Sequence, residues 1–411
     1  MATIAVAGAS LAGVQACQVL RRQGFDGRLV VIGDETHQPY DRPPLSKEYL
    51  TADAPDEERL KLRATADPAA LDLDWRLGRA AAALDLDEAS VTLDDGEIVG
   101  FDGLVIATGA APRRLPGQRH DGDTDRGPLL ELRTLDDARR LRAAIDGGAT
   151  RIVVCGAGFI GAEVAASARQ RGLDVTLIDA APVPMDRVLD ARAGEAVADL
   201  HRANGVDVRL GVKVTEVASA AGAGAGAGAT VTLDDGSELA ADVVVVGIGV
   251  VPNTGWLDGS GLTVDDGVIT DATTLAAPNV VAAGDVARWP NQRFDGRLMR
   301  VEQWDNAIDM GGHAARRLLV ELDGGEPEPF QPVPWFWSDQ YDRKMQLAGL
   351  VGRTSEIVQG TIAEGRFVQL YADDEDRFCG ALCWNRPRQA IQARQLVAEG
   401  ASLDVARERL G

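Results

Sequence analysis

A repeated pattern of apolar and polar positions gives the first indication of the fold. The chain opens with a short apolar run at 4–7, a turn with glycines at 8–13 and a helix-like run at 14–23. A second apolar run at 28–32 follows and ends in an acidic pair. Short apolar strands on either side of one helix are typical of a βαβ unit in a parallel sheet.

The same pattern recurs further along the chain. An apolar run at 151–154 leads into a turn with three glycines at 156–161, and a helix-like run continues to Arg171. The next apolar run, at 174–178, ends in Asp179. Such glycines let the backbone approach phosphates, while the first helical amides and the helix dipole face the negative charge. Two copies therefore predict two nucleotide sites.

The two turns differ in ways that bear on the nucleotide. In the second copy Asp179, expected to bind ribose hydroxyls, is followed by Ala180 and Ala181, so no basic residue stands ready for a 2′-phosphate. This favours NAD over NADP. In the first copy Ser10 takes the place of the middle glycine, where its hydroxyl can donate to a pyrophosphate or point away from it.

Three further apolar runs that lead into glycine bear on the domain organisation. They lie at 104–109, 243–249 and 280–285. Their order predicts that the first nucleotide domain is interrupted by the second and then resumes. An Ala- and Gly-rich stretch at 220–229 is interpreted as a flexible hairpin loop without function.

A change of composition after residue 329 predicts a third domain. Residues 335–337 bring Trp, Phe and Trp together, a strand is expected at 378–384, a helix at 387–399 and a terminal turn at 401–410. The expected fold class is α/β, with two Rossmann-like domains and a C-terminal α+β domain. The expected boundaries are 1–111 with 247–327 for the first nucleotide domain, 112–246 for the second and 328–411 for the third.

Composition and charge disfavour several classes of protein. A formal net charge of −21 opposes binding to nucleic acid or to anionic membranes. The longest apolar run, 243–251, is far shorter than the about 20 residues that span a bilayer, and no targeting segment is recognised, so a cytoplasmic location is expected. Four cysteines without a Cys-x-x-Cys pair argue against disulfide exchange, and four scattered histidines argue against a metal site.

Longer motifs are more specific than either turn. On these motifs the sequence resembles the ferredoxin reductases of bacterial oxygenase systems, of the putidaredoxin, rhodocoxin and biphenyl-dioxygenase type, within the glutathione-reductase-like flavoprotein superfamily. The resemblance covers essentially the whole chain. Its most specific marks are the segments 39–47, 156–163, 284–285, 301–306 and 335–341.

The resemblance implies an FAD site that begins at the first turn. At the pyrophosphate and the adenosine ribose it implies Gly8, Ser10, Leu11, Ala12, Gly13, Asp34 and Glu35. At other parts of the FAD it implies Arg42, Pro44, Lys47, Ala82, Ala107, Thr108, Gly109, Arg133, Gly284, Asp285, Glu302, Gln303, Trp304, Ala307 and Trp337. Asp285 is expected at the ribityl chain.

The resemblance likewise implies an NAD(H) site at the second turn. Its residues are Gly156, Gly158, Phe159, Ile160, Gly161, Glu163, Asp179, Arg187, Gly247, Ile248 and Gly249. Lys47 and Glu163 are expected to form an ion pair beside the reacting rings and are the two residues given a catalytic role. That role is to tune and position, because hydride transfer to a flavin needs no side-chain acid or base.

The activity that the resemblance implies is transfer of electrons from NADH through FAD to a [2Fe-2S] ferredoxin serving a cytochrome P450 or a ring-hydroxylating dioxygenase. The ferredoxin is expected to bind transiently, and the reductase to be a monomer or weak homodimer. Two alternatives stay open: a reductase of a small molecule or rubredoxin, and a redox-sensing interaction protein like apoptosis-inducing factor. Candidate basic residues for docking an acidic ferredoxin are Arg300, Arg343, Lys344, Arg386 and Arg388.

Overall fold

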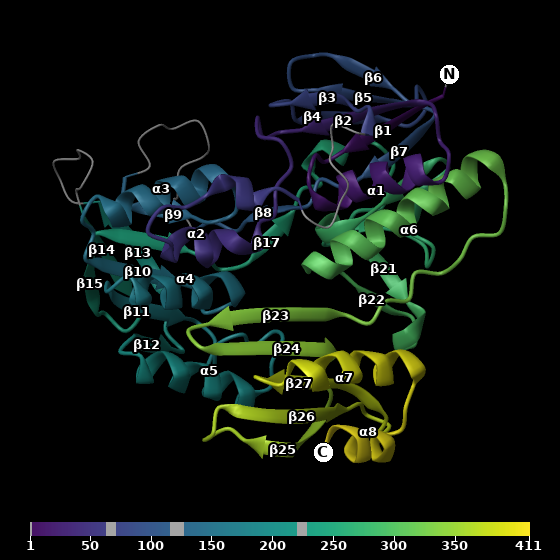
Figure 1. The fold of residues 1–411 in the computed structure, drawn as a ribbon. Coiled ribbons are helices and arrows are strands. Elements are labelled where there is room, and N and C mark those ends of the chain that lie inside the picture. The colour runs from purple at the N-terminus through teal and green to yellow at the C-terminus, as the bar shows by residue number, and fades with distance from the viewer. Residues whose placement is uncertain (1, 63–70, 116–126, 220–227) are drawn as a thin grey trace. The chain divides into compact units, whose positions relative to one another are not determined.

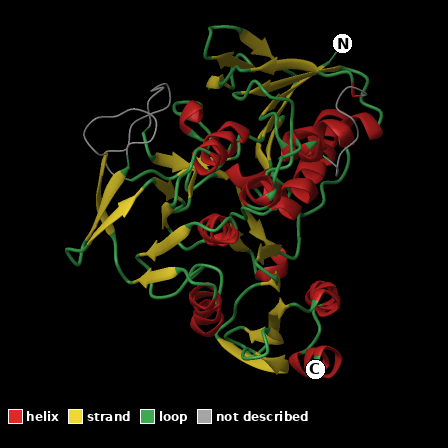
Figure 2. Ribbon diagram, turned by 60° about the vertical axis from the view of Figure 1, so that its left-hand side comes forward, coloured by secondary structure: helices red, strands yellow, loops and turns green. Residues whose placement is uncertain are grey.

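The computed structural model describes residues 2–62, 71–115, 127–219 and 228–411 (Figure 1). Its internal contacts divide the chain into two compact units. The first unit comprises Met1–Asp41, Glu57–Ala111 and Val251–Phe336, and the second comprises Arg42–Asp56, Pro112–Val250 and Trp337–Gly411. Each unit contains both helices and strands (Figure 2). The finer division into three domains stays a prediction.

A six-stranded sheet forms the centre of the first unit. Its order is β19-β20-β7-β1-β2-β3, and all neighbours are parallel except β19 and β20. Its inner strands are almost wholly buried, as expected for a sheet covered on both faces. The bounds are β1 (Thr3–Ala7), β2 (Arg28–Gly33), β3 (Asp74–Leu77), β7 (Gly103–Ile106), β19 (Leu275–Ala277) and β20 (Val280–Ala282).

Two helices, α1 (Leu11–Arg22) and α6 (Trp304–Asp323), lie side by side in the first unit (Figure 1). Helix α1 begins at Leu11, earlier than the predicted start at residue 14, because Ser10 occupies the N-cap position with an extended backbone. It ends before Gly24, whose φ of +90° does not continue a helix.

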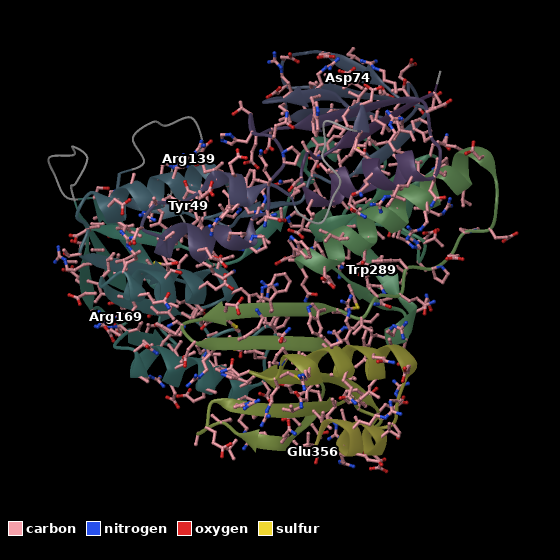
Figure 3. All side chains as sticks on the ribbon, viewed as in Figure 1. Tyr49, Asp74, Arg139, Arg169, Trp289 and Glu356 are labelled. Atoms are coloured by element: carbon pink, nitrogen blue, oxygen red, sulfur yellow. The ribbon has the colours of Figure 1, made fainter. Side chains whose placement is uncertain are left out.

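Smaller sheets complete the first unit. Trp289 on β21, labelled in Figure 3, is fully buried and its ring contacts Phe330. The bounds are β4 (Ala81–Asp85), β5 (Ser90–Leu93) and β6 (Ile98–Gly100) in one sheet, and β18 (Val268–Ile269), β21 (Ala287–Asn291) and β22 (Arg297–Met299) in another. Strands β8 (Ala110–Pro112) and β17 (Val250–Pro252) lie where the chain passes from one unit to the other.

The second unit contains a parallel sheet of order β12-β11-β10-β16-β9. A three-stranded antiparallel sheet packs its apolar side against Val153 and Cys155 of this sheet. The strands are β9 (Leu129–Glu131), β10 (Arg151–Cys155), β11 (Asp174–Asp179), β12 (Asp207–Leu210), β13 (Val214–Ser219), β14 (Ala229–Leu233), β15 (Glu238–Ala241) and β16 (Val243–Val246). The helices are α3 (Leu135–Asp146), α4 (Phe159–Gln170) and α5 (Ala191–Ala203). Most of the expected hairpin loop, 220–227, lies outside the described residues.

A second sheet of the same unit is built from the C-terminal part of the chain. Its order is β23-β24-β27-β26-β25, with strands β23 (Trp335–Gln340), β24 (Arg343–Gly349), β25 (Thr354–Thr361), β26 (Arg366–Ala372) and β27 (Phe378–Trp384). The predicted helix is confirmed as α7 (Pro387–Glu399). The predicted terminal turn is wrong: these residues form α8 (Leu403–Leu410), because the Ser402 side chain caps its first turn and Ala406 and Leu410 are buried.

The two sheets of mainly parallel strands and the C-terminal antiparallel sheet confirm the predicted α/β fold class. The segment 42–56, which the sequence places between strands of the first sheet, belongs by its contacts to the second unit. It contains the 3₁₀ turn η1 (Pro43–Ser46) and the short helix α2 (Glu48–Thr51). Over the described ranges, none of the helices combines the length and the apolar character needed to cross a bilayer.

Candidate nucleotide and redox sites

The glycine turn of the first unit lies at the carboxyl end of β1. Gly8 has a φ of +129°, and a Cβ built on it would lie 2.0 Å from the carbonyl oxygen of Ala107 at the end of β7. A Cβ on Gly13 would lie 2.0 Å from the oxygen of Gly8. Among the described residues the Ser10 side chain makes no capping hydrogen bond, so the first amides of α1 are left for another acceptor. This arrangement fits a pyrophosphate.

The neighbouring strand ends bring other predicted residues to the same edge of the first sheet. Thr108 donates through Oγ1 to the carbonyl oxygen of Asn253 at 2.9 Å, and the Asn253 side chain donates back to the Thr108 carbonyl at 2.9 Å. A Cβ on Gly284, which follows β20, would lie 3.0 Å from the Cβ of Ala12. Gly8, Thr108 and Gly284 therefore share one edge, where parallel α/β sheets bind ligands. The sequence prediction missed Asn253.

The two acidic residues after β2, Asp34 and Glu35, differ in exposure. Asp34 is exposed, whereas Glu35 is half-buried and accepts a hydrogen bond from the hydroxyl of Tyr40 at 2.5 Å. Tyr40 was not among the predicted site residues, although the motif at 39–47 contains it. A carboxylate held at the end of the second strand fits an adenosine ribose.

The predicted residues around the start of α6 are tied into the first unit. The Trp304 indole nitrogen donates to Asp41 at 2.9 Å, and Gln303 accepts from the backbone amide of Trp335 at 2.9 Å. Glu302 pairs with Arg300 at 2.6 Å. Of the remaining predicted residues of this unit, Asp285 lies in a 3₁₀ turn after β20, Ala307 lies in α6, and Ala82 is exposed on β4.

The glycine turn of the second unit repeats the geometry of the first. Gly156 has a φ of +103°, and a Cβ on it would lie 2.3 Å from the carbonyl oxygen of Gly247 at the end of β16. Gly158 is the N-cap of α4 and has no side chain to cap it. Ile160, in the first turn of α4, is 41% exposed, so its side chain is accessible to a ligand bound at this turn.

The acidic residue at the end of β11 is joined to this turn by hydrogen bonds. Asp179 accepts from the backbone amide of Ala157 at 2.6 Å and from that of Ala181 at 2.8 Å. Its carboxylate is therefore fixed beside the glycines, where a ribose is expected. Phe159 lies in the first turn of α4, Arg187 is exposed, and Ile248 packs on the apolar core below β16.

Lys47 and Glu163 form a buried ion pair within the second unit. The Lys47 ammonium lies 2.7 Å from Oε2 of Glu163, and the two side chains are 14% and 4% exposed. The Glu163 carboxylate also accepts from Ser46 at Oε2, at 2.5 Å, and from Ser338 at Oε1, at 2.8 Å. The structure thus brings the two predicted catalytic residues together. Their role stays a prediction.

The segment that carries Lys47 is fastened to α3 and α4. Arg142 of α3 donates to the carbonyl oxygens of Tyr49 and Ala52 at 3.1 and 2.5 Å (Tyr49 is labelled in Figure 3). Ser167 of α4 donates to the carbonyl of Ser46 at 2.7 Å. These contacts fix the backbone on both sides of Lys47. No local pattern predicts them, because the partners lie about 90 residues or more apart in the chain.

The predicted FAD residues are divided between the two units. The second unit holds five of them: Arg42, Pro44, Lys47, Arg133 and Trp337. Within that unit Arg42 donates to the backbone oxygen of Arg133 at 2.8 Å, which brings two of the five together. Trp337 is half-buried on β23, on the strand face opposite Ser338.

All four cysteines are free and buried. Burial raises the pKa of the Cys17, Cys155 and Cys383 thiols to about 12 and that of Cys379 to about 11. Protonated, buried thiols are poor nucleophiles. The cysteines therefore do not supply disulfide chemistry.

The predicted docking residues prove unequal. The prediction that Arg300 is a docking residue on the surface is wrong, because its side chain is 6% exposed and pairs with Asp266 and Glu302. Arg343 and Lys344 pair with neighbouring carboxylates. Arg386 and Arg388, together with Arg366, line a cavity of about 340 Å³ at the start of α7. We call these three residues, Arg366, Arg386 and Arg388, the arginine cluster.

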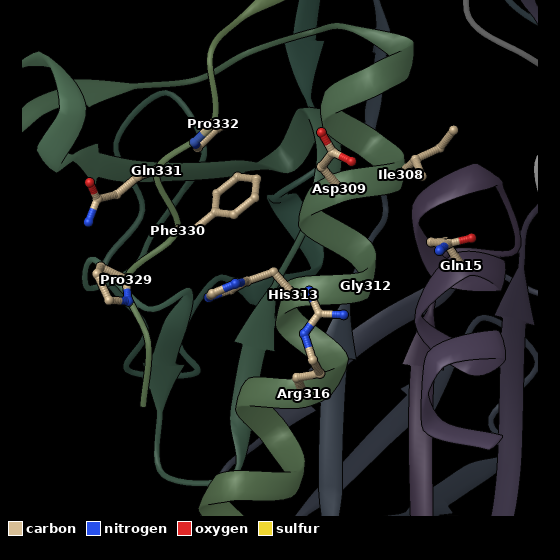
Figure 4. A pocket seen from close by; sticks show the side chains of 10 residues that line it. All are labelled: Gln15, Ile308, Asp309, Gly312, His313, Arg316, Pro329, Phe330, Gln331 and Pro332. Carbon is tan, nitrogen blue, oxygen red and sulfur yellow. The ribbon is translucent and has the colours of Figure 1, made fainter. Parts of the chain in front are cut away.

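A second cavity, of about 360 Å³, lies in the first unit between α6, α1 and the segment 329–332 (Figure 4). The rings of His313 and Phe330 meet in it at 5.1 Å, with Gln15 and Arg316 at its sides. Of the cofactor residues expected from the sequence, none in the described ranges lines this cavity.

Comparison with known proteins extends over the whole chain. Residues 2–311 match the pyridine nucleotide-disulphide oxidoreductase family, and residues 335–409 match the reductase C-terminal family. Rhodocoxin reductase of Rhodococcus erythropolis is 39% identical over 96% of this chain and 89% of its own length. Putidaredoxin reductase of Pseudomonas putida is 36% identical over 96% and 92%.

A solved structure supports the same assignment. The covalent complex of putidaredoxin reductase with putidaredoxin contains a chain with a TM-score of 0.88 and 32% identity, covering 100% of this chain and 98% of that one. Both the core and the C-terminal sheet are therefore shared. The chain belongs to the pyridine nucleotide-disulphide oxidoreductase family, in the branch that carries the reductase C-terminal domain.

Proposed function

We propose that this protein is an FAD-dependent NADH:ferredoxin reductase that passes electrons to a [2Fe-2S] ferredoxin of a P450 or dioxygenase system in the cytoplasm. The observation that carries the proposal is similarity along the full length, C-terminal domain included, to reductases named for such ferredoxins. The buried, protonated cysteines agree with it, because a family member without an exposed thiol must pass its electrons to another acceptor.

Each glycine turn has a separate binding task in this proposal. The turn at Gly8 holds the FAD pyrophosphate, with Glu35 at the ribose, and the turn at Gly156 holds that of NADH, with Asp179 at the ribose. FAD, when bound, supplies the exchange between hydride transfer and single-electron transfer. The carboxylate of Asp179, with alanines after it, favours NADH because it repels a 2′-phosphate.

The ion pair of Lys47 and Glu163 positions charge in a site that excludes most water. A buried cation interacts strongly with nearby negative charge because the local dielectric constant is low. Glu163 holds the ammonium in one place. The pair is proposed to favour the reduced cofactor without itself transferring a proton.

The ferredoxin is proposed to meet basic residues despite the overall negative charge. The arginine cluster is the strongest of the docking candidates. Arg300, Arg343 and Lys344 each pair with a carboxylate, whereas within the described residues the three arginines of the cluster form no ion pair. Charge complementarity mainly raises the rate of encounter and orients the partners.

An absorbance experiment tests the proposed function. The purified holoprotein is expected to show a flavin spectrum that NADH bleaches without air and that added [2Fe-2S] ferredoxin restores while the ferredoxin becomes reduced. A panel with a quinone and a rubredoxin measures the competing acceptors. Preference for either over every ferredoxin tested would replace the proposed acceptor, and a preparation without flavin would end the proposal.

A further inference from the structure

A line of buried polar side chains runs from Glu163 to helix α5. Ser338 and Gln340 lie on the inner face of β23, where alternate residues point inward, and both are 0% exposed. Gln340 donates through Nε2 to Ser338 Oγ at 3.2 Å. His201 of α5, also 0% exposed, lies with Nε2 3.0 Å from Gln340 Oε1. Its Nδ1 lies 3.1 Å from the hydroxyl of Tyr341.

The hydrogen bonds of this line have only one consistent direction. The Glu163 carboxylate only accepts, so Ser338 donates to it and must receive the amide hydrogen of Gln340. Gln340 Oε1 can only accept, so His201 carries its hydrogen on Nε2 and Nδ1 accepts from Tyr341. Burial lowers the pKa of His201 to about 4, which keeps this neutral form at ordinary pH.

Such a line is costly to bury unless it is satisfied, and here each link has a partner. It ends on the oxygen of Glu163 that Lys47 does not use. Lys47 and Ser46 bind Oε2, while Ser338 of β23 binds Oε1, so the two oxygens are held by different segments of the unit. The line does not conduct protons, because the amide of Gln340 does not readily accept and release one. The role that fits it is to position the Glu163 carboxylate.

We propose that Ser338, supported by Gln340 and His201, is a positioning residue that keeps the Glu163 carboxylate directed at Lys47. The inference rests on the proposed function and adds the C-terminal sheet to the reductive half of the reaction. It assigns β23 a task in the NADH-dependent step, separate from any contact with a ferredoxin.

The test compares the Ser338→Ala holoenzyme with the wild type. Without the hydrogen bond to Oε1, the Glu163 carboxylate is held by Lys47 and Ser46 alone and is free to turn, so flavin reduction by NADH is expected to slow by about tenfold. The effect is measured in two ways, as the single-turnover rate of flavin reduction by NADH and as the flavin midpoint potential, which a merely structural role would not move. Lys47 is the charged group that faces Glu163 here, with Ser46 as a neutral donor.

Two variants serve as matched controls. Ser338→Thr keeps the hydroxyl and is expected to restore the wild-type rate and potential. Thr354→Ala removes an exposed hydroxyl from β25 of the same sheet and is expected to leave both unchanged. Wild-type values in Ser338→Ala, or an equal change in Thr354→Ala, would overturn the proposal. Should Ser338→Ala not fold, Gln340→Met removes the next link and is expected to slow flavin reduction by less.

Double variants show whether the effect runs through Glu163. The effect of Ser338→Ala on the rate is expected to vanish in a Glu163→Gln background, because the carboxylate that Ser338 positions is then absent. His201→Phe alone is expected to have a smaller effect that adds nothing to that of Ser338→Ala. Additive effects of the two variants would show that His201 does not act through Ser338. Failure of the proposed function is distinct, since it appears as a wild-type flavin that NADH does not reduce.

Discussion

The two glycine turns have nearly the same backbone but different surroundings. In each, the first glycine has a positive φ and approaches the carbonyl of a neighbouring strand end, Ala107 in one case and Gly247 in the other. The second residue after the N-cap is Ala12 in α1 and Ile160 in α4. Ala12 is 7% exposed, whereas Ile160 is 41% exposed.

The difference arises from α6. A Cβ built on Gly311 of α6 would lie 2.4 Å from the carbonyl oxygen of Ala12, so the two helices touch through their backbones at the start of α1. In the second unit, the corresponding position at Ile160 is left open. A covered turn suits a cofactor that stays bound, and an open one suits a nucleotide that enters and leaves in each cycle. The packing around each turn, rather than its backbone, therefore determines whether the turn suits a resident or an exchanging nucleotide.

The largest effects are expected from adding a side chain to the first glycine of each turn. Gly8→Ala is expected to yield protein without flavin, because the new Cβ would meet the Ala107 carbonyl at 2.0 Å. Gly156→Ala is expected to keep its flavin while the rate of NADH-dependent reduction falls at least about a hundredfold, since its Cβ meets Gly247. Flavin content by absorbance and stopped-flow reduction measure the two outcomes.

Two other glycines control for backbone strain alone. Gly24 and Gly172 follow α1 and α4 with φ of +90° and +84°, yet a Cβ on either would meet nothing within 4 Å. Their alanine variants are expected to lose only about 1 kcal/mol of stability and no cofactor binding. Equal losses in all four variants would show that backbone strain, not the close approach to the Ala107 and Gly247 carbonyls, governs both turns.

The next largest effect is expected at Lys47. Lys47→Ala leaves the Glu163 carboxylate buried without its cation, which costs about 3 kcal/mol in the free energy of unfolding. Flavin reduction by NADH is expected to slow by roughly tenfold or more. Lys61, whose ion pair with Glu58 is exposed, provides the control, and Lys61→Ala should change neither quantity. An unchanged single-turnover rate in Lys47→Ala would remove its assigned role.

The sequence predicted the turns and the ion pair, but not how they are held. Strand, glycine, helix and acid are neighbours in the sequence, so local patterns revealed Gly8 to Gly13 and Gly156 to Gly161. Lys47 and Glu163 came from the family resemblance. Asn253 and Arg142 were missed because their contacts join distant segments and their residue types carry no local signal. Ser338 lies within the recognised motif 335–341, but the interpretation of that motif considered only the aromatic residues beside it.

The covering of the first turn by α6 can be tested by itself. Gly311→Ala is expected to push α6 from α1 and weaken FAD binding by about tenfold, while NAD⁺ binding is unchanged. Gly312→Ala is the matched control, since its Cβ would first meet a Val19 methyl group at 3.3 Å, and alanine favours a helix. Equilibrium dialysis of FAD against both variants measures the difference.

The smallest effect concerns the acids at the two turns. Glu35 is held by the side chain of Tyr40, but Asp179 is held by two backbone amides, one of them in the glycine turn itself. A carboxylate fixed in this way discriminates against a 2′-phosphate by repulsion, so Asp179→Asn is expected to lower the preference for NADH over NADPH by several-fold. The ratio of kcat/KM for the two nucleotides measures this. Asp174→Asn, at the other end of β11, should leave the ratio unchanged, and flavin content should be constant throughout, because an exchanging nucleotide and a resident one are bound by separate turns.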